Sequence, residues 1–255
     1  MDKKQREARR RQEDIALQKG LLWVAGAVVL EVLLVLLNRF YINIPLSDSR
    51  IQIALTLHEV LKVARMAAPV AAALALLWTV WQLKQRKPYV PQLALTAALA
   101  AVSVCIHVAI KFRNAGMSML YWLVIAWAVL AMVFYIYQRE FFLGASACGM
   151  SVLALWFVRF GPAGRPEAIL LTAAILVVGL ISLWLKKNDG ALNDKTGQYF
   201  LPKGSSYGVL LVTCLASLIA VAAAMLAGGV VAYYLVYVMI AWLFALFVYY
   251  TVKLM

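Results

Sequence analysis

Five basic side chains fall at helical spacing near the ends of two neighbouring apolar segments. His58, Lys62 and Arg65 follow an i, i+4, i+7 pattern, so they share one face of a helix. On the next apolar segment, His107 and Lys111 are four residues apart. Imidazole, ammonium and guanidinium groups that converge in this way bind phosphate or carboxylate groups. The pattern therefore predicts an outward-facing basic pocket for a lipid phosphate or a small acid.

The same five residues admit a second interpretation, in which the two sets never meet. Long basic side chains near the ends of membrane helices extend toward the interface, where their charged groups stay hydrated. In that case each set lies at the membrane surface for its own reasons, and no pocket forms. Both interpretations remain open at the level of the sequence.

Two carboxylates, Glu31 and Glu59, are predicted to be buried ionisable groups. Glu31 lies inside the first apolar run, where an ionised group costs free energy unless it is paired or hydrated. One interpretation pairs it with a basic residue of a neighbouring helix, and Arg65 is at a similar estimated depth. The other interpretation has Glu31 bind a proton or a cation during transport.

Motifs for hydrolysis or metal chemistry are absent from the sequence. There is no HExxH, GxSxG or Asp-rich cluster, and His58-Glu59 lacks a second histidine at ligand spacing. Cys105, Cys148 and Cys214 fall in separate apolar runs without a CxxC pair, which favours packing residues over disulfides or zinc ligands. We therefore expect no catalytic residue, no metal and no cofactor.

The elements that position these residues follow from the composition. Of 255 residues, 65% are apolar and only 14% are charged, whereas a soluble domain has about a quarter charged residues. So many apolar residues cannot be hidden in one water-soluble core of this size. The sequence predicts an all-α fold, a polytopic transmembrane helical bundle of about eight spans with both termini in the cytoplasm.

Eight apolar runs are long enough to cross a hydrocarbon layer of about 30 Å. The charge-free stretch from Gly204 to Val252 is too long for one span, and Ala227–Gly229 is its natural turn. Charge alone marks the boundary at Gln138–Glu140 between the fourth and fifth spans. An amphipathic segment, 51–65, precedes the second span. The predicted spans are 21–37, 66–83, 88–110, 116–137, 141–158, 168–185, 207–226 and 231–251.

The net charge of +13 is concentrated in a basic arm, residues 1–19, and in short gaps between spans. Residues 20–255 form the transmembrane domain, and the first span is expected to stay uncleaved. Basic residues accumulate on the cytoplasmic side of membrane proteins, which gives the orientation. We expect the arm, Lys3–Lys19, to bind anionic headgroups of membrane lipids, and no nucleic-acid module is recognisable.

Small residues at four-residue spacing indicate close helix contacts. These contacts lie within the bundle or at an interface with a membrane protein partner or a second copy. The residues are Ala216, Ala220 and Ala224, then Gly144 with Cys148 and Ala145 with Gly149.

Transport or lipid handling by a multi-pass protein of a bacterial-type cell membrane is the leading functional hypothesis. The alternatives are an accessory or scaffolding subunit of a membrane complex and a membrane-embedded enzyme.

Overall fold

The structure is a computed structural model that describes residues 3–43, 48–84, 90–136, 139–187, 191–193, 198–199 and 206–254. The described chain is helical apart from a small antiparallel pair, β1 (Ala191–Asn193) and β2 (Gln198–Tyr199). Seven of its helices are long and apolar enough to cross a membrane. The chain is therefore an integral, multi-pass membrane protein, as predicted. It forms two compact units, one of residues 21–129 and one of residues 1–20 with 130–255.

The unit of residues 21–129 begins within α1 (Lys3–Leu37), which runs from the basic arm through the first span without a break. The side chains of 3–16 and 19 lie outside the described residues, so lipid binding by the arm stays a prediction. A π-helix, η1 (Asn38–Ile42), continues α1 by one turn. The next helix, α2 (Asp48–Lys84), joins the predicted amphipathic segment to the second span in one helix that passes through Pro69.

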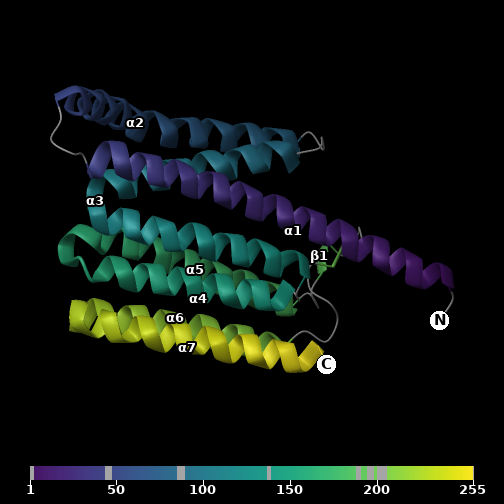
Figure 1. Cartoon of the computed structure of the whole chain (residues 1–255). Coiled ribbons are helices and arrows are strands. Elements are labelled where there is room, and N and C mark those ends of the chain that lie inside the picture. The colour runs from purple at the N-terminus through teal and green to yellow at the C-terminus, as the bar shows by residue number, and fades with distance from the viewer. Residues whose placement is uncertain are drawn as a thin grey trace. The chain divides into compact units, whose positions relative to one another are not determined.

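The predicted third and fourth spans both lie within α3 (Val90–Ile136), which is interrupted at Arg113. Arg113 has φ 44° and ψ −122°, a conformation that breaks the helix. A Cβ placed on Gly116 would lie 2.6 Å from the carbonyl oxygen of Val108. Eight residues of straight helix span about 12 Å, so this proximity requires the chain to fold back. Figure 1 shows the two halves of α3 running in opposite directions, which gives eight crossings from seven long helices.

The second unit is a four-helix bundle of α4 (Arg139–Val158), α5 (Arg165–Lys187), α6 (Tyr207–Ala227) and α7 (Gly229–Leu254) (Figure 1). The start of α4 at Arg139 confirms the predicted separation of the fourth and fifth spans. α4 contacts each of the other three helices. More than half of its membrane stretch is buried in the protein (56%), compared with 17–39% for α5, α6 and α7.

Small side chains explain the central place of α4. Ala147, Cys148, Ser151 and Ala154 are fully buried, because the neighbouring helices approach its backbone closely on several sides. On α6, Ala224 is also fully buried. The small-residue ladders of both helices therefore face the inside of the bundle, which is the intramolecular alternative of the two predicted for them.

Two glycine-containing turns close the bundle at one end. Between α4 and α5, the 3-10 helix η2 (Gly161–Gly164) places Gly164 so near the carbonyl of Phe157 that a Cβ would overlap it. Between α6 and α7, Gly228 has φ 93°, and its N–H donates to the carbonyl of Ala224 at 2.8 Å. This turn confirms the division predicted at residues 227–229.

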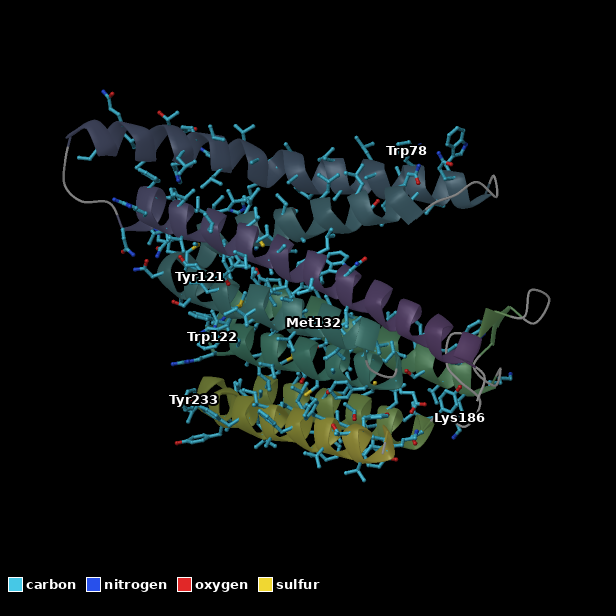
Figure 2. The ribbon with its side chains drawn as sticks, turned by 45° about the vertical axis from the view of Figure 1, so that its right-hand side comes forward. Trp78, Tyr121, Trp122, Met132, Lys186 and Tyr233 are labelled. Atoms are coloured by element: carbon cyan, nitrogen blue, oxygen red, sulfur yellow. The ribbon has the colours of Figure 1, made fainter. Side chains whose placement is uncertain are left out.

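The two ends of the bundle differ in side-chain chemistry. Lys186, in the last turn of α5, lies at one end of this unit, and Tyr233, in the first turns of α7, lies at the other (Figure 2). We call these the lysine end and the tyrosine end. Because of the positive-inside rule, we expect the lysine end to face the cytoplasm.

Candidate functional site

The three basic residues predicted on α2 are accessible in the unit of residues 21–129. His58 and Lys62 are exposed, and Arg65 is half-buried. His58 is held in place by Tyr41 of η1: its Nδ1 lies 2.9 Å from the Tyr41 hydroxyl, and the two rings stack with centroids 5.9 Å apart. This contact joins the first third of α2 to η1.

The two basic residues predicted on α3 are half-buried. Lys111 Nζ lies 5.5 Å from the ring centroid of Phe112, a cation–π contact with its own neighbour in sequence. One basic residue of each helix therefore contacts an aromatic ring: His58 contacts Tyr41, and Lys111 contacts Phe112. The convergence of His107 and Lys111 with the α2 set stays a prediction.

Glu31 lies on the side of α1 that faces the second half of α3. It shares that side with Ala27 and Leu34, which are both buried. Two contacts identify the neighbour. The hydroxyl of Tyr121 donates to the carbonyl of Leu34 at 3.3 Å, and Trp23 packs edge-to-face on Trp127 at 4.9 Å. In the antiparallel register that these contacts set, Glu31 lies between the levels of Tyr121 and Trp127.

The predicted ion pair between Glu31 and Arg65 is not formed. Oε1 of Glu31 is buried and has no hydrogen-bond partner among the described residues. The physical reason is direction, because Glu31 faces α3 whereas Arg65 belongs to α2. Glu59 also differs from expectation: its side chain is exposed in this unit, on the polar side of α2, and the burial predicted for it is not seen.

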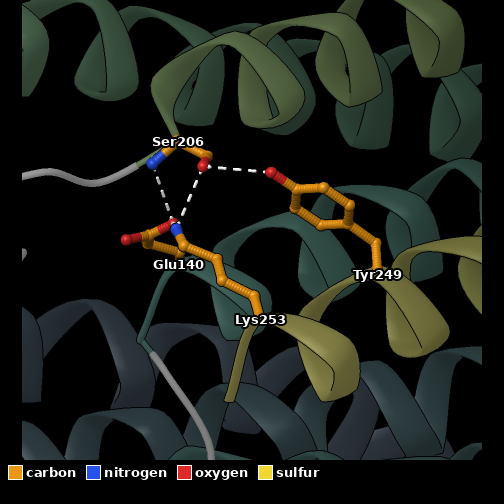
Figure 3. Close-up of polar contacts among 4 residues, drawn as sticks. All are labelled: Glu140, Ser206, Tyr249 and Lys253. Carbon is orange, nitrogen blue, oxygen red and sulfur yellow. Dashed lines mark hydrogen bonds and ion pairs between the residues drawn. The ribbon is translucent and has the colours of Figure 1, made fainter. Parts of the chain in front are cut away.

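A second group of ionisable residues gathers at the lysine end of the bundle (Figure 3). Glu140, in the first turn of α4, is only 3% exposed. Its Oε2 accepts a hydrogen bond from the Ser206 N–H at 2.9 Å and from Lys253 Nζ at 3.2 Å. Lys253 also donates to the Ser206 hydroxyl at 3.0 Å, and that hydroxyl lies 3.2 Å from the hydroxyl of Tyr249. The network ties α4, α6 and α7 together.

Local structure explains why Glu140 is stable in this place. A carboxylate in the first turn of a helix is favoured by the helix dipole. The N–H of Ser206 precedes α6 and needs a partner outside that helix, which Glu140 provides. In the sequence, Glu140 stands out only as a charge at the boundary between two spans. A signal was nevertheless present, since the eight-span topology places Glu140 and Lys253 on the same side of the membrane.

Small polar side chains lie in the middle of the bundle, and only some of those described have a hydrogen-bond partner there. Nε1 of Trp242 donates to the Thr213 hydroxyl at 3.2 Å, which explains a tryptophan far from either interface. The Thr213 hydroxyl in turn donates to the carbonyl of Val209 at 2.8 Å. The hydroxyl of Ser217, one turn along α6, is fully buried and has no hydrogen-bond partner within the described part of the chain.

Neither a metal site nor a similarity to known proteins indicates what the site does. The described residues hold no group of three or more His, Cys, Asp or Glu side chains that could ligate a metal ion. No protein-family model, no curated protein and no solved structure matches the chain. Function therefore has to be inferred from the chemistry of the residues described above.

Proposed function

We propose that this membrane protein moves an anion, a small acid or an anionic lipid headgroup, together with a proton that binds to Glu31. The observation that carries the proposal is the buried carboxylate oxygen of Glu31, which has no hydrogen-bond partner among the described residues. An unpaired charge in a membrane span is costly and marks ion pathways or proton relays in this class of protein. A proton or a cation bound to Glu31 removes that cost.

The basic residues of α2 supply the other half of the proposal. His58 and Lys62 are exposed, and Arg65 continues the same helical face toward the membrane interior. Cationic groups in this arrangement attract a carboxylate or phosphate and orient it. A proton that travels with an anion reduces the net charge moved by one unit, so the Coulombic barrier to crossing the hydrocarbon layer is lowered. The two features are thus chemically complementary.

A specific observation favours the second candidate, an accessory or scaffolding subunit. Only 11% of the membrane stretch of α2 and 17% of that of α1 is buried within the structure. Large apolar side chains such as Val63, Met66 and Leu77 are more than 60% exposed. Lipid covers such a surface in a transporter, whereas a partner protein covers it in a scaffold.

Transport assays in proteoliposomes test the proposal with two kinds of substrate. An imposed inward proton gradient should drive uptake of radiolabelled succinate or inorganic phosphate if the substrate is a small acid. If it is a lipid, fluorescent phosphatidylglycerol should become accessible to dithionite faster than in protein-free vesicles. Absence of activity in both arms would reject transport of these anions and leave the scaffold.

Three variants connect the activity to the residues. Glu31→Gln should reduce the dependence on the proton gradient at least tenfold, since an amide cannot bind a proton at neutral pH. Lys62→Gln should raise the substrate concentration needed for half-maximal rate. Glu59→Gln is the matched control, because Glu59 is an exposed carboxylate on α2, and its activity should match that of the wild type. Equal effects of Glu31→Gln and Glu59→Gln would contradict the coupling role.

A further inference from the structure

At the tyrosine end of the bundle, Arg159 lies over the ring of Tyr233, which contacts a second tyrosine of α7, Tyr237. The guanidinium carbon of Arg159 is 5.1 Å from the ring centroid of Tyr233. The hydroxyl of Tyr237 donates to the hydroxyl of Tyr233 at 2.8 Å. All three side chains are exposed, with 40% of Tyr233 and 55% of Tyr237 accessible. A cation, an aromatic face and two hydroxyls therefore lie together on one surface.

The backbone holds Arg159 in this position. Its N–H donates to the carbonyl of Leu155 at 3.3 Å, and the next residue, Phe160, donates to the carbonyl of Phe157. α7 begins directly against this turn, since a Cβ on Gly229 would lie 3.2 Å from the carbonyl oxygen of Arg159. The backbone of Arg159 is thus fixed beside α7, and the contact of its guanidinium with the Tyr233 ring orients the side chain, which lowers the entropy lost on binding.

Arg159 retains its hydrogen-bonding capacity for a ligand. No carboxylate of the described residues forms an ion pair with it, and its contact with the Tyr233 ring leaves its guanidinium N–H groups without a hydrogen-bond partner among these residues. The N–H edge of a guanidinium matches two oxygens of a phosphate. The hydroxyl of Tyr233 accepts a hydrogen bond from Tyr237, so its own proton is available to a third phosphate oxygen.

The surface below this group is apolar along the whole of α7. Exposed side chains recur at helical spacing on one face, which also carries Tyr237. The members of this apolar stripe are Val230, Tyr234, Ala241, Phe244, Val248 and Val252. Acyl chains of a lipid pack on such a face, and the phosphate of the same lipid lies at the level of the interfacial tyrosines.

We propose that Arg159 and Tyr233 bind the phosphate of an anionic phospholipid, whose acyl chains lie along the apolar stripe of α7, and that Tyr237 orients the Tyr233 hydroxyl through its hydrogen bond. The positive charge of the site selects an anionic headgroup over a zwitterionic one. Arg165, exposed at the start of α5, is a further cation at this end of the bundle and is not part of the proposed site. The site belongs to the four-helix bundle and does not depend on the transport role of Glu31.

Binding of defined lipids to the full-length protein tests this site. In detergent, native mass spectrometry should show phosphatidylglycerol binding about tenfold more tightly than phosphatidylcholine to the wild type. Arg159→Gln should reduce the affinity for phosphatidylglycerol about tenfold, the loss expected for one charge-assisted contact. Tyr237→Phe, which keeps the ring, should reduce it twofold to threefold. Inorganic phosphate at the same concentration should not displace the lipid.

The matched control is Arg165→Gln, which removes a charge from the same end without removing the stacked guanidinium. Its affinity for phosphatidylglycerol should stay within twofold of the wild type. Equal weakening by Arg159→Gln and Arg165→Gln would overturn the proposal, because it would indicate general attraction by charge. Equal binding of the two lipids to the wild type would also overturn it. If Arg159→Gln fails to fold, Tyr237→Phe replaces it, and an unchanged affinity of that variant would overturn the proposal.

Discussion

Lys253 Nζ lies 3.2 Å from Glu140 Oε2, although 113 residues separate the two in sequence. The pair is asymmetric, because the Glu140 side chain is 3% exposed and that of Lys253 is 31% exposed. Lys253→Gln leaves a buried carboxylate with its Ser206 contact but no cation. Glu140→Gln leaves a lysine that water can still hydrate. We therefore expect Lys253→Gln to destabilise the bundle by about 2–3 kcal/mol and Glu140→Gln by about 1 kcal/mol.

Unfolding in detergent, followed by circular dichroism, measures both losses. The double variant should be less unstable than the sum of the single variants, since it leaves neither charge unpaired. Tyr249→Phe is a useful control, because it removes only the hydroxyl at the edge of the network. Equal losses of stability for Lys253→Gln and Glu140→Gln would contradict the prediction that an unpaired buried carboxylate costs more than an unpaired exposed lysine.

The break in α3 makes a prediction about topology. With eight crossings, Asn43 and Pro162 lie on the same side of the membrane and Lys187 on the other. If α3 crossed only once, Asn43 and Pro162 would lie on opposite sides. Single cysteines at these three exposed positions, in a background lacking the native cysteines, test this with a membrane-impermeant maleimide. Those at Asn43 and Pro162 should be labelled from one side of the membrane, and that at Lys187 from the other.

Gly116 should be intolerant of even a methyl group. Gly116→Ala places a Cβ 2.6 Å from the carbonyl oxygen of Val108, and backbone on both sides of the Arg113 break must then move. We expect a loss of about 1–3 kcal/mol, the usual range for overpacking. Gly26→Ala is the matched control within the same unit, because nothing lies within 4 Å of its Cβ position. It should stabilise α1 slightly, since alanine favours a helix by up to about 1 kcal/mol. Thermal unfolding distinguishes the two, and similar midpoints would argue against the close turn.

A substitution at Ser217 is expected to stabilise the protein. Its buried hydroxyl has no partner among the described residues, so Ser217→Ala removes a desolvated polar group and should raise the unfolding midpoint. Thr213→Val removes a hydroxyl that accepts from Trp242, and leaves the indole N–H without a partner. That change should lower stability by about 0.6–1.7 kcal/mol, as found for hydrogen bonds between membrane helices. A loss of stability in Ser217→Ala would reveal an unseen partner, such as a buried water.

Glu31 and Arg65 should behave as independent residues. Because Glu31 faces α3 and forms no ion pair with Arg65, the effects of Glu31→Gln and Arg65→Gln on unfolding should add within about 0.5 kcal/mol. A double-mutant cycle in detergent measures the coupling. A coupling well above that value would restore the ion pair that the sequence suggested.

Hydropathy was sufficient to predict the spans, because the boundaries between them are marked in the sequence by charged residues or glycines. The Arg113 break follows Lys111 in an otherwise apolar stretch, and the turn at Gly228 divides a charge-free stretch that is too long for one helix. The continuity of α2 through residues 51–84 was not predicted, because the sequence changes from amphipathic to apolar there. We expect the helix to enter the membrane near this change in polarity, and the hydrogen bonding of its backbone continues across it.

Contacts between helices were harder to predict than the helices themselves. The depth of Glu31 in its span follows from the sequence, but depth does not tell which neighbour its side chain faces. That direction depends on packing, here on Trp23 and Leu34 against α3. In the same way, Glu140 and Lys253 could be assigned to one membrane face. Their contact required knowing that α4 and α7 are adjacent.

The central position of α4 has a consequence for the order of folding during synthesis. α4 leaves the ribosome before α5, α6 and α7, so its small-residue faces first meet lipid or the insertion machinery. Lys253, the cation that Glu140 needs, arrives only in the last turn of α7. Until then we expect the bare carboxylate to keep that end of α4 at the membrane surface. The bundle can complete its packing only after the eighth span is inserted, and a ribosome stalled before α7 should hold α4 in a protease-sensitive state.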